Sequence, residues 1–227
     1  MNDSQEKFDV FVFSKTAGYR HDSISAGIKG LTDLGVSSGS FNITASEDAS
    51  LINAQFLSRF RVVVFLSTSG EFLTSEQLNG LKTYVNDGGG FVGIHCAAAG
   101  MYSEPWYGEL VGAYFAGHPE PQRGVVRVEG ESKGHVIVSG MPEEMEWLDE
   151  WYNFKVNPRG KVTVLLSIDE ELYEGGTMGP DHPIAWCREF DGGRTFYTAL
   201  GHFDEAYRDK AFMGHLLKGI LWAARVI

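Results

Sequence analysis

Short, unbroken apolar runs alternate along this chain with segments that have helical features. Runs at residues 8–13, 61–67 and 90–94 are typical of parallel strands buried on both faces, and a weaker one lies at 41–45. Helices are expected at residues 23–34, between 74 and 87, from about 105, and at 209–226. The second of these opens on a capping box, and the last has an apolar stripe to face a sheet. This alternation predicts an α/β fold.

The pattern becomes strand-rich between residues 120 and 198. Strands are expected there at residues 124–128, 150–154, 162–168 and 184–188. A hairpin turn at Asp191-Gly192-Gly193 then leads into a last strand at 195–200. Because no linker composition marks a boundary, we expect a single domain over residues 1–227, with the region from about 120 to 198 as an elaboration of the same sheet.

Composition narrows the class of partner. The 227 residues are 43% hydrophobic and carry a net charge of −11 with no run of Lys and Arg, which argues against nucleic acid and anionic membranes. The polar start at residues 1–7 does not resemble a signal peptide, and no apolar stretch approaches the roughly 20 residues of a membrane span, so we expect a cytoplasmic protein. Cys96 and Cys187 are too few for a disulfide framework or a thiolate zinc site.

Histidines mark the candidate site. The strand at 90–94 runs into a turn of small residues, which places His95 at the carboxyl edge of the sheet, where open α/β folds bind ligands. His21 and His202 also follow predicted strands, and His118 lies in a loop that could reach the same edge. We therefore expect these four imidazoles to converge. No functional role is assigned to His135, His182 or His215.

Five segments in order support a family resemblance. They are Gly18-Tyr19-Arg20-His21-Asp22-Ser23-Ile24, Gly93-Ile94-His95-Cys96-Ala97, Tyr114-Phe115-Ala116-Gly117-His118-Pro119, Asp149-Glu150-Trp151-Tyr152 and Tyr197-Thr198-Ala199-Leu200-Gly201-His202. Together they resemble the trehalose-utilisation (ThuA-like) family over nearly the whole chain. That family is similar to the class I glutamine amidotransferases, which implies a flavodoxin-like sandwich with a mostly parallel central sheet and helices on both faces.

The same resemblance bears on the catalytic groups. The elbow that carries a cysteine nucleophile in the amidotransferases matches His95, and their His-x-Glu motif matches His202 and Asp204. Cys96 stands one residue late, so its thiol is expected to point away from the cleft. Glutaminase activity is therefore not expected.

Two kinds of chemistry suit the remaining groups. In the first, one histidine removes a proton and another donates one, with His95 and His202 as the candidates, while Asp204 or Glu150 fixes a tautomer. In the second, a divalent metal such as zinc is bound by His21, His95, His118 and His202. Because the sequence has no compact metal-binding spacing, no cofactor is assigned.

Family resemblance implies carbohydrate metabolism and a small-molecule carbohydrate as ligand. We expect proton transfer, isomerisation or elimination on a sugar or keto-sugar, because protons next to a carbonyl are acidic enough for a histidine base. The residues assigned to sugar binding are His21, His118, Arg20, Trp106 and Tyr152. The rings of Trp106 and Tyr152 have core packing as their alternative role.

The sequence leaves open whether the protein is an enzyme and whether it forms a homodimer. A domain that binds a sugar or a protein partner without turnover is the alternative to an enzyme, because the nucleophile of the related fold is missing. A homodimer is a candidate assembly that the sequence neither requires nor excludes.

Overall fold

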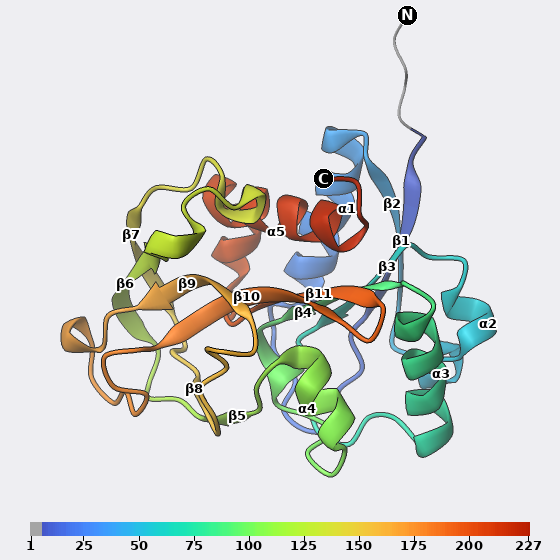
Figure 1. Ribbon diagram of the computed structural model, residues 1–227, viewed down its shortest axis with the longest axis horizontal. Helices are drawn as coiled ribbons and strands as arrows, with labels where there is room; N and C mark the ends of the chain where they lie inside the picture. Colours follow the sequence, from blue (N-terminus) through green and yellow to red (C-terminus); the bar gives the residue numbers. More distant parts are fainter. Residues whose placement is uncertain (1–5) are drawn as a thin grey trace, which may run out of the picture.

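One mixed sheet of nine strands runs through the computed structural model, which describes residues 6–227 (Figure 1). Residues 1–5, part of the polar start considered above, lie outside the described residues. The strand order is β2-β1-β3-β4-β11-β10-β9-β6-β7. The strands of this sheet are β1 (Phe8–Phe13), β2 (Phe41–Ser46), β3 (Val62–Leu66), β4 (Gly90–Ile94), β6 (Gln122–Val128), β7 (Glu144–Asp149), β9 (Thr163–Ile168), β10 (Pro183–Phe190) and β11 (Gly193–Thr198).

The first five strands of that order are parallel, in the arrangement of flavodoxin-like folds, and the other four continue the sheet as antiparallel neighbours. The expected α/β fold with a parallel core is thereby confirmed. The strand-rich elaboration lies at the side of the sheet opposite β2 (Figure 1). A separate two-stranded ladder pairs β5 (Phe115–Gly117) with β8 (Asn153–Phe154).

Helices cover both faces of the sheet. α1 and α5 lie on one side, whereas α3 and α4 lie on the other, with α2 packed beside α3 (Figure 1). Their bounds are α1 (Ile24–Ser38), α2 (Ala54–Leu57), α3 (Ser75–Asn86), α4 (Pro105–Val111) and α5 (Lys210–Ala223). The capping box at Thr74 and Gln77 is present, and in the α5 stripe Phe212, Leu216 and Ile220 are fully buried. No helix within residues 6–227 is long and apolar enough to cross a bilayer.

The buried runs explain why the central strands form. All five residues of β3 and of β4 are buried, as expected for strands covered by helices on both faces. Burying each Val, Leu, Ile or Phe side chain stabilises the fold by roughly 1.5–3 kcal/mol. This packed centre fixes the carboxyl ends of β1, β3, β4 and β11, from which the site is built.

One strand expectation is wrong. Residues 150–154 do not form a strand, because β7 ends at Asp149 and only Asn153–Phe154 returns to a ladder, as β8. The side chain of Asp149 accepts the backbone N–H of Glu150 at 2.9 Å, which turns the chain out of β7. The strand β7 was not predicted from the sequence, because it alternates exposed and half-buried residues instead of forming an apolar run.

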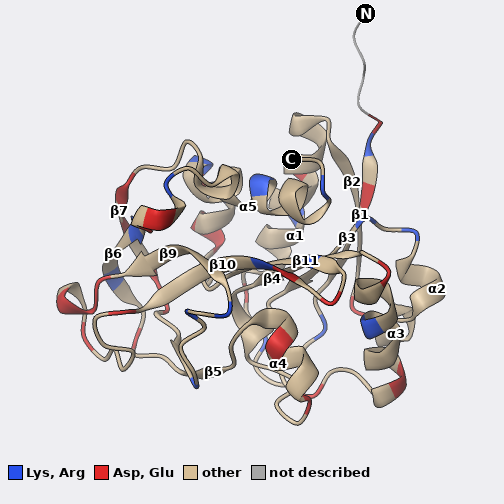
Figure 2. Cartoon of the chain, in the orientation of Figure 1, with Lys and Arg blue, Asp and Glu red and all other residues tan. Residues whose placement is uncertain are grey.

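Positively and negatively charged residues are interspersed along the chain. Figure 2 shows Lys and Arg placed singly among Asp and Glu along the described chain. Several are paired across strands and loops, as in Arg127 with Glu144 at 2.9 Å and Arg159 with Asp181 at 2.7 Å. The expectation that nucleic acid is no partner stays a prediction.

Candidate active site

The elbow after β4 holds His95 in a strained conformation. His95 has a φ of +52°, a left-handed value that is uncommon for a residue with a side chain, and it begins a 3₁₀ turn, η2 (His95–Ala98). Gly93 permits the close packing behind it, since a Cβ there would lie 3.0 Å from the ring of Tyr197. A strained strand-to-helix turn of this kind is common at functional sites of α/β folds.

Hydrogen bonds define the tautomer of His95. Its Nδ1 lies 2.6 Å from the carbonyl oxygen of Ala199, and because a carbonyl only accepts, Nδ1 carries a proton and donates it. In the neutral ring Nε2 is therefore an acceptor, and the Tyr152 hydroxyl donates to it at 2.9 Å. His95 is completely buried, so it lies beneath the cleft instead of projecting into it.

Three imidazoles surround one carboxylate. Oε2 of Glu150 lies 3.1 Å from His202 Nδ1, 3.3 Å from His95 Nε2 and 3.7 Å from His21 Nε2. The rings of His21 and His95 also meet edge to face, with their Nε2 atoms 3.1 Å apart. On the other carboxylate oxygen, Oε1 lies 3.5 Å from His118 Nε2. The structure thus brings His21, His95, His202 and Glu150 together, with His118 at the margin.

The charge of Glu150 is maintained by its surroundings. Burial alone would raise the pKa of Glu150, but the imidazoles of His202, His21 and His95 outweigh that effect and hold the pKa far below its usual range. For His202, burial acts to lower the pKa, yet the carboxylates of Glu150 and Asp149 leave it raised. For His21, burial prevails and the pKa is lowered. The cluster therefore contains a stable negative charge at its centre.

A second carboxylate, Asp149, holds the cluster in place. Its side chain accepts four N–H groups, those of the Glu150, Gly201 and His202 backbones and of the Trp147 indole, at 2.9–3.1 Å. Asp149 is completely buried. It ties the end of β7 to the loop after β11, and so sets Glu150 and His202 side by side. Asp149 stands in one of the five family-like segments, but nothing in that segment indicates this role.

A cleft of about 510 Å³ opens above these groups. It lies at the carboxyl ends of the parallel strands, where this class of sheet binds ligands. Its walls are partly aromatic, and its lining comprises Gly18, Tyr19, His21, Ser69, Gly70, Cys96, Ala99, Tyr102, Phe115, His118, Glu150 and Tyr152. Four of the predicted residues, His21, His118, Glu150 and Tyr152, thus face one cavity.

Three predicted site residues lie elsewhere. Asp204 is exposed at the start of η6 (Asp204–Arg208), and its carboxylate has no hydrogen bond or ion pair to His202 among the described residues. Arg20 is exposed and bound to Glu47 at 2.6 Å. Trp106, in α4, donates its indole N–H to Asp191 at 2.6 Å and packs on Phe190. These side chains have partners outside the cleft, so the structure does not bring Asp204, Arg20 or Trp106 to the site.

The expectation for Cys96 also needs correction. Cys96 lines the cleft beside Tyr152, because the 3₁₀ turn directs the imidazole of His95 below the floor and leaves the next residue at the wall. It is nevertheless only 4% exposed. Burial, with a contribution from the charge of Glu150, raises the pKa of the thiol to about 12. The thiol is neutral near pH 7 and is not a poised nucleophile.

We therefore expect Cys96 to be unreactive in the folded protein. Iodoacetamide at pH 8 should label it far more slowly than in the urea-unfolded chain, as followed by mass spectrometry, and Cys96→Ala should keep any turnover of the wild type. Cys187, which is also buried with its pKa raised to about 12, is the internal control. Rapid labelling of native Cys96 together with loss of turnover would restore a thiol mechanism.

One discounted histidine proves to support the cleft. His182 is completely buried, with Nδ1 2.7 Å from Glu170 Oε1 and Nε2 2.9 Å from the carbonyl oxygen of Tyr152. It anchors the backbone of a cleft residue. Its position in a Pro- and Gly-rich loop gave no periodic signal from which this contact could be inferred. His215, which was also given no functional role, is buried in α5.

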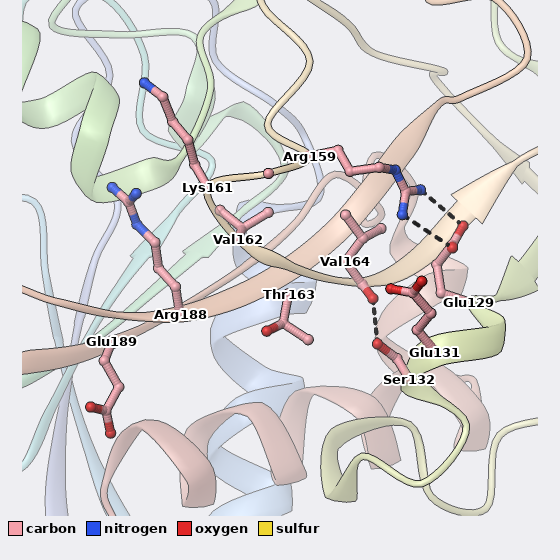
Figure 3. Close-up of a pocket in the computed structure, with 11 residues that line it drawn as sticks. Glu129, Glu131, Ser132, Arg159, Lys161, Val162, Thr163, Val164, Arg188 and Glu189 are labelled. Carbon is pink, nitrogen blue, oxygen red and sulfur yellow. Dashed lines mark hydrogen bonds and ion pairs between the residues drawn. The ribbon is translucent and has the colours of Figure 1, made fainter.

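A larger hollow, of about 690 Å³, lies beside β9 and β10 (Figure 3). Its cations already have carboxylate partners: Arg159 binds Glu129, whereas Lys161 and Arg188 both approach Glu109. No histidine lines it. The cleft at the end of β4 is therefore the better candidate for chemistry despite its smaller volume.

Comparison with known proteins adds a family and a set of similar folds. The family model for ThuA, described as trehalose utilisation, matches residues 9–223. No match was found among curated proteins. Similar solved structures include a ThuA-like protein from Bacteroides uniformis, 24% identical with a TM-score of 0.82, in which the match covers 96% of this chain and 92% of the other.

Two further structures extend the fold likeness. A ThuA-like protein from Parabacteroides merdae is 20% identical, with a TM-score of 0.80 over 96% of this chain and 90% of the other. A β-galactosidase from Bacillus circulans matches 94% of this chain with only 30% of its own length, at 11% identity and a TM-score of 0.61. At these identities the likenesses show the fold alone.

Proposed function

This chain belongs to the ThuA (trehalose utilisation) family, and we propose that it acts on a sugar or keto-sugar by proton transfer at a carbon next to a carbonyl group. One observation carries the proposal: three imidazoles gather round a single ionised carboxylate at the floor of a cleft. Such groups suit general acid–base chemistry, and the aromatic wall suits the C–H face of a sugar ring.

His118 is the group best placed to remove the proton. Its side chain is 33% exposed and lines the cleft, and its Nδ1 donates to the carbonyl oxygen of Pro119 at 2.8 Å. That bond leaves the lone pair of Nε2 free to accept a proton. The imidazolium formed would then be stabilised by Glu150, whose Oε1 lies 3.5 Å from the same nitrogen.

The reaction requires a proton donor on the carbonyl side. When the C–H bond breaks, its electron pair forms a C=C bond and the π pair of the carbonyl moves to the oxygen. The enediolate so formed needs a proton on that oxygen. Burial raises the pKa of the Tyr152 phenol well above its ordinary value, so this cleft residue stays protonated and can donate. Return of the proton to the former carbonyl carbon, with loss of the O–H proton on the deprotonated carbon, gives an isomer. Departure of a substituent from the carbon on the far side of the deprotonated carbon, as the carbonyl group re-forms, gives elimination.

The catalytic roles expected for His95 and His202 stay predictions. His95 is buried below the cleft and contacts the cleft residues Tyr152 and Glu150. A ligand in the cleft would therefore contact His118 and Tyr152 directly, but not His95.

Solvent exchange tests the proposal directly. Wild-type protein in D₂O should incorporate deuterium next to the carbonyl of 3-keto-glucose or a keto-disaccharide, as followed by proton NMR. His118→Ala and Glu150→Gln should each lower that rate by about 10²–10⁴-fold, the usual contribution of an acid–base group. Glu205→Gln, an exposed carboxylate in η6, is the matched control and should exchange at the wild-type rate.

Two results would speak against an enzyme of this kind. Undiminished exchange in both His118→Ala and Glu150→Gln would remove these groups from the reaction. Stabilisation of the fold by a keto-sugar with neither exchange nor product would instead support the alternative of a domain that binds sugar without turnover.

A further inference from the structure

We propose that His21, His95, His202 and Glu150 form a site for one divalent transition-metal ion. The ligand atoms of these four residues all lie within 4.8 Å of one another. They come from four separate segments: His95 and Glu150 directly follow β4 and β7, whereas His21 lies in the loop between β1 and α1 and His202 in the loop after β11. This inference goes beyond the proposed reaction, because a metal can be bound whether or not the protein turns over a sugar.

The spacing of the ligand atoms fits a metal ion at their centre. Ligands bonded at about 2.1 Å in a tetrahedron lie about 3.4 Å from one another. In the cluster, His95 Nε2 lies 3.1 Å from His21 Nε2 and 3.3 Å from Glu150 Oε2. The other two contacts of Glu150 Oε2, with His202 Nδ1 at 3.1 Å and with His21 Nε2 at 3.7 Å, fall on either side of that value.

The tautomer of His95 supports a cation between these groups. Because its Nδ1 donates to the Ala199 carbonyl, its neutral ring presents a lone pair on Nε2, 3.3 Å from a carboxylate oxygen that is also an acceptor. A cation between these two acceptors would remove their repulsion, and the Tyr152 hydroxyl, which otherwise donates to the same nitrogen, would then be free for a ligand in the cleft. An imidazole whose other nitrogen donates to a carbonyl is also the usual arrangement of a metal-binding histidine.

One unpartnered nitrogen also supports a metal ion at this place. Nδ1 of His202 lies close to Glu150 but not in hydrogen-bond geometry, and it has no hydrogen-bond partner in the described chain. The backbones of Glu150 and His202 are both fixed by Asp149, as the outer contacts of a metal site usually are. His202 and Glu150 are thus held close together without forming a hydrogen bond to each other.

The types of ligand atom indicate which ions the site would bind, and their burial indicates where a free coordination position would lie. Imidazole with one carboxylate suits zinc and its transition-metal neighbours more than magnesium or calcium, which prefer oxygen ligands. Of the four ligands, His21 and Glu150 line the cleft, whereas His95 is completely buried behind them. A further coordination position would therefore face the cleft and could take a water or the carbonyl oxygen of a ligand.

Metal titration of chelator-treated protein tests the site. Elemental analysis after incubation with zinc and gel filtration should give one ion per chain, and Co²⁺ should give visible absorption bands typical of four- or five-coordinate nitrogen and oxygen ligation. His202→Gln and Glu150→Gln should weaken zinc binding by more than the roughly 10–100-fold that loss of an outer contact costs. His118→Gln should bind as the wild type does, since its imidazole lies outside the four-residue set.

The other possible results of these measurements would contradict the metal site. Equal zinc affinity in wild type and His202→Gln, or a Co²⁺ spectrum of free aqueous ion with the wild type, would overturn the proposal and leave a protonated His95 as the explanation of the close contacts. The Co²⁺ spectrum needs only the wild-type protein, so it serves even if a variant does not fold. His118→Ala separates this inference from the proposed function, because it should lose proton exchange while keeping the metal.

Discussion

Replacement of Asp149 by alanine should lower the free energy of unfolding by about 3–5 kcal/mol, because the buried carboxylate accepts four N–H groups. Each unsatisfied buried donor costs about 1–3 kcal/mol, and water that enters the space left by the side chain offsets part of that cost. The same change releases the backbones of Glu150 and His202, so the cluster should lose its geometry even in molecules that remain folded.

Urea denaturation followed by tryptophan fluorescence would measure the change in stability, and proton exchange in keto-sugars would measure the loss of the site. Asp204→Ala is the matched control. Asp204 is exposed and was expected from the sequence to be the carboxylate partner of His202, but its removal should leave the unfolding free energy and the exchange rate nearly unchanged. Equal stability of Asp149→Ala and wild type would show that the four N–H groups find other partners.

The fold and the position of the site could both be predicted from the sequence. Buried apolar runs identified β1, β3 and β4. The position of a residue that directly follows such a strand is fixed by the backbone of the strand. His95 and the segments of His21 and His202 were therefore located at one edge before their side chains were known. Backbone topology alone was enough to bring these imidazoles together.

The carboxylates and the sugar-binding side chains were harder to predict because their placement depends on side-chain partners. Glu150, and not Asp204, faces His202, since the turn after β7 is made by a hydrogen bond from the Glu150 backbone to Asp149. Arg20 and Trp106 have long or broad side chains with acidic neighbours outside the cleft, at Glu47 and Asp191. No periodicity in the sequence distinguishes those directions.

Gly201 should be nearly as sensitive as Asp149, and Gly201→Ala should lower the free energy of unfolding by about 2–4 kcal/mol. Gly201 has a φ of +118°, which side chains rarely adopt, and a Cβ there would lie 2.8 Å from the hydroxyl oxygen of Tyr207. Its carbonyl accepts hydrogen bonds from Ser23 and Tyr207, and its N–H donates to Asp149. Relief of the strain must move the next residue, His202.

Substitutions at two other glycines distinguish the strain of a positive φ from the steric clash as causes of the lower stability of Gly201→Ala. Gly39 also has a positive φ, of +67°, but nothing lies within 4 Å of a Cβ there, so Gly39→Ala should cost only about 1–2 kcal/mol. Gly214 lies in α5 with open space around it, and Gly214→Ala should stabilise the helix by up to about 1 kcal/mol. Urea denaturation ranks the three variants, and zinc affinity should fall only in Gly201→Ala. A Gly201→Ala protein that matches Gly39→Ala in stability and binds zinc as the wild type does would mean that this loop does not position His202.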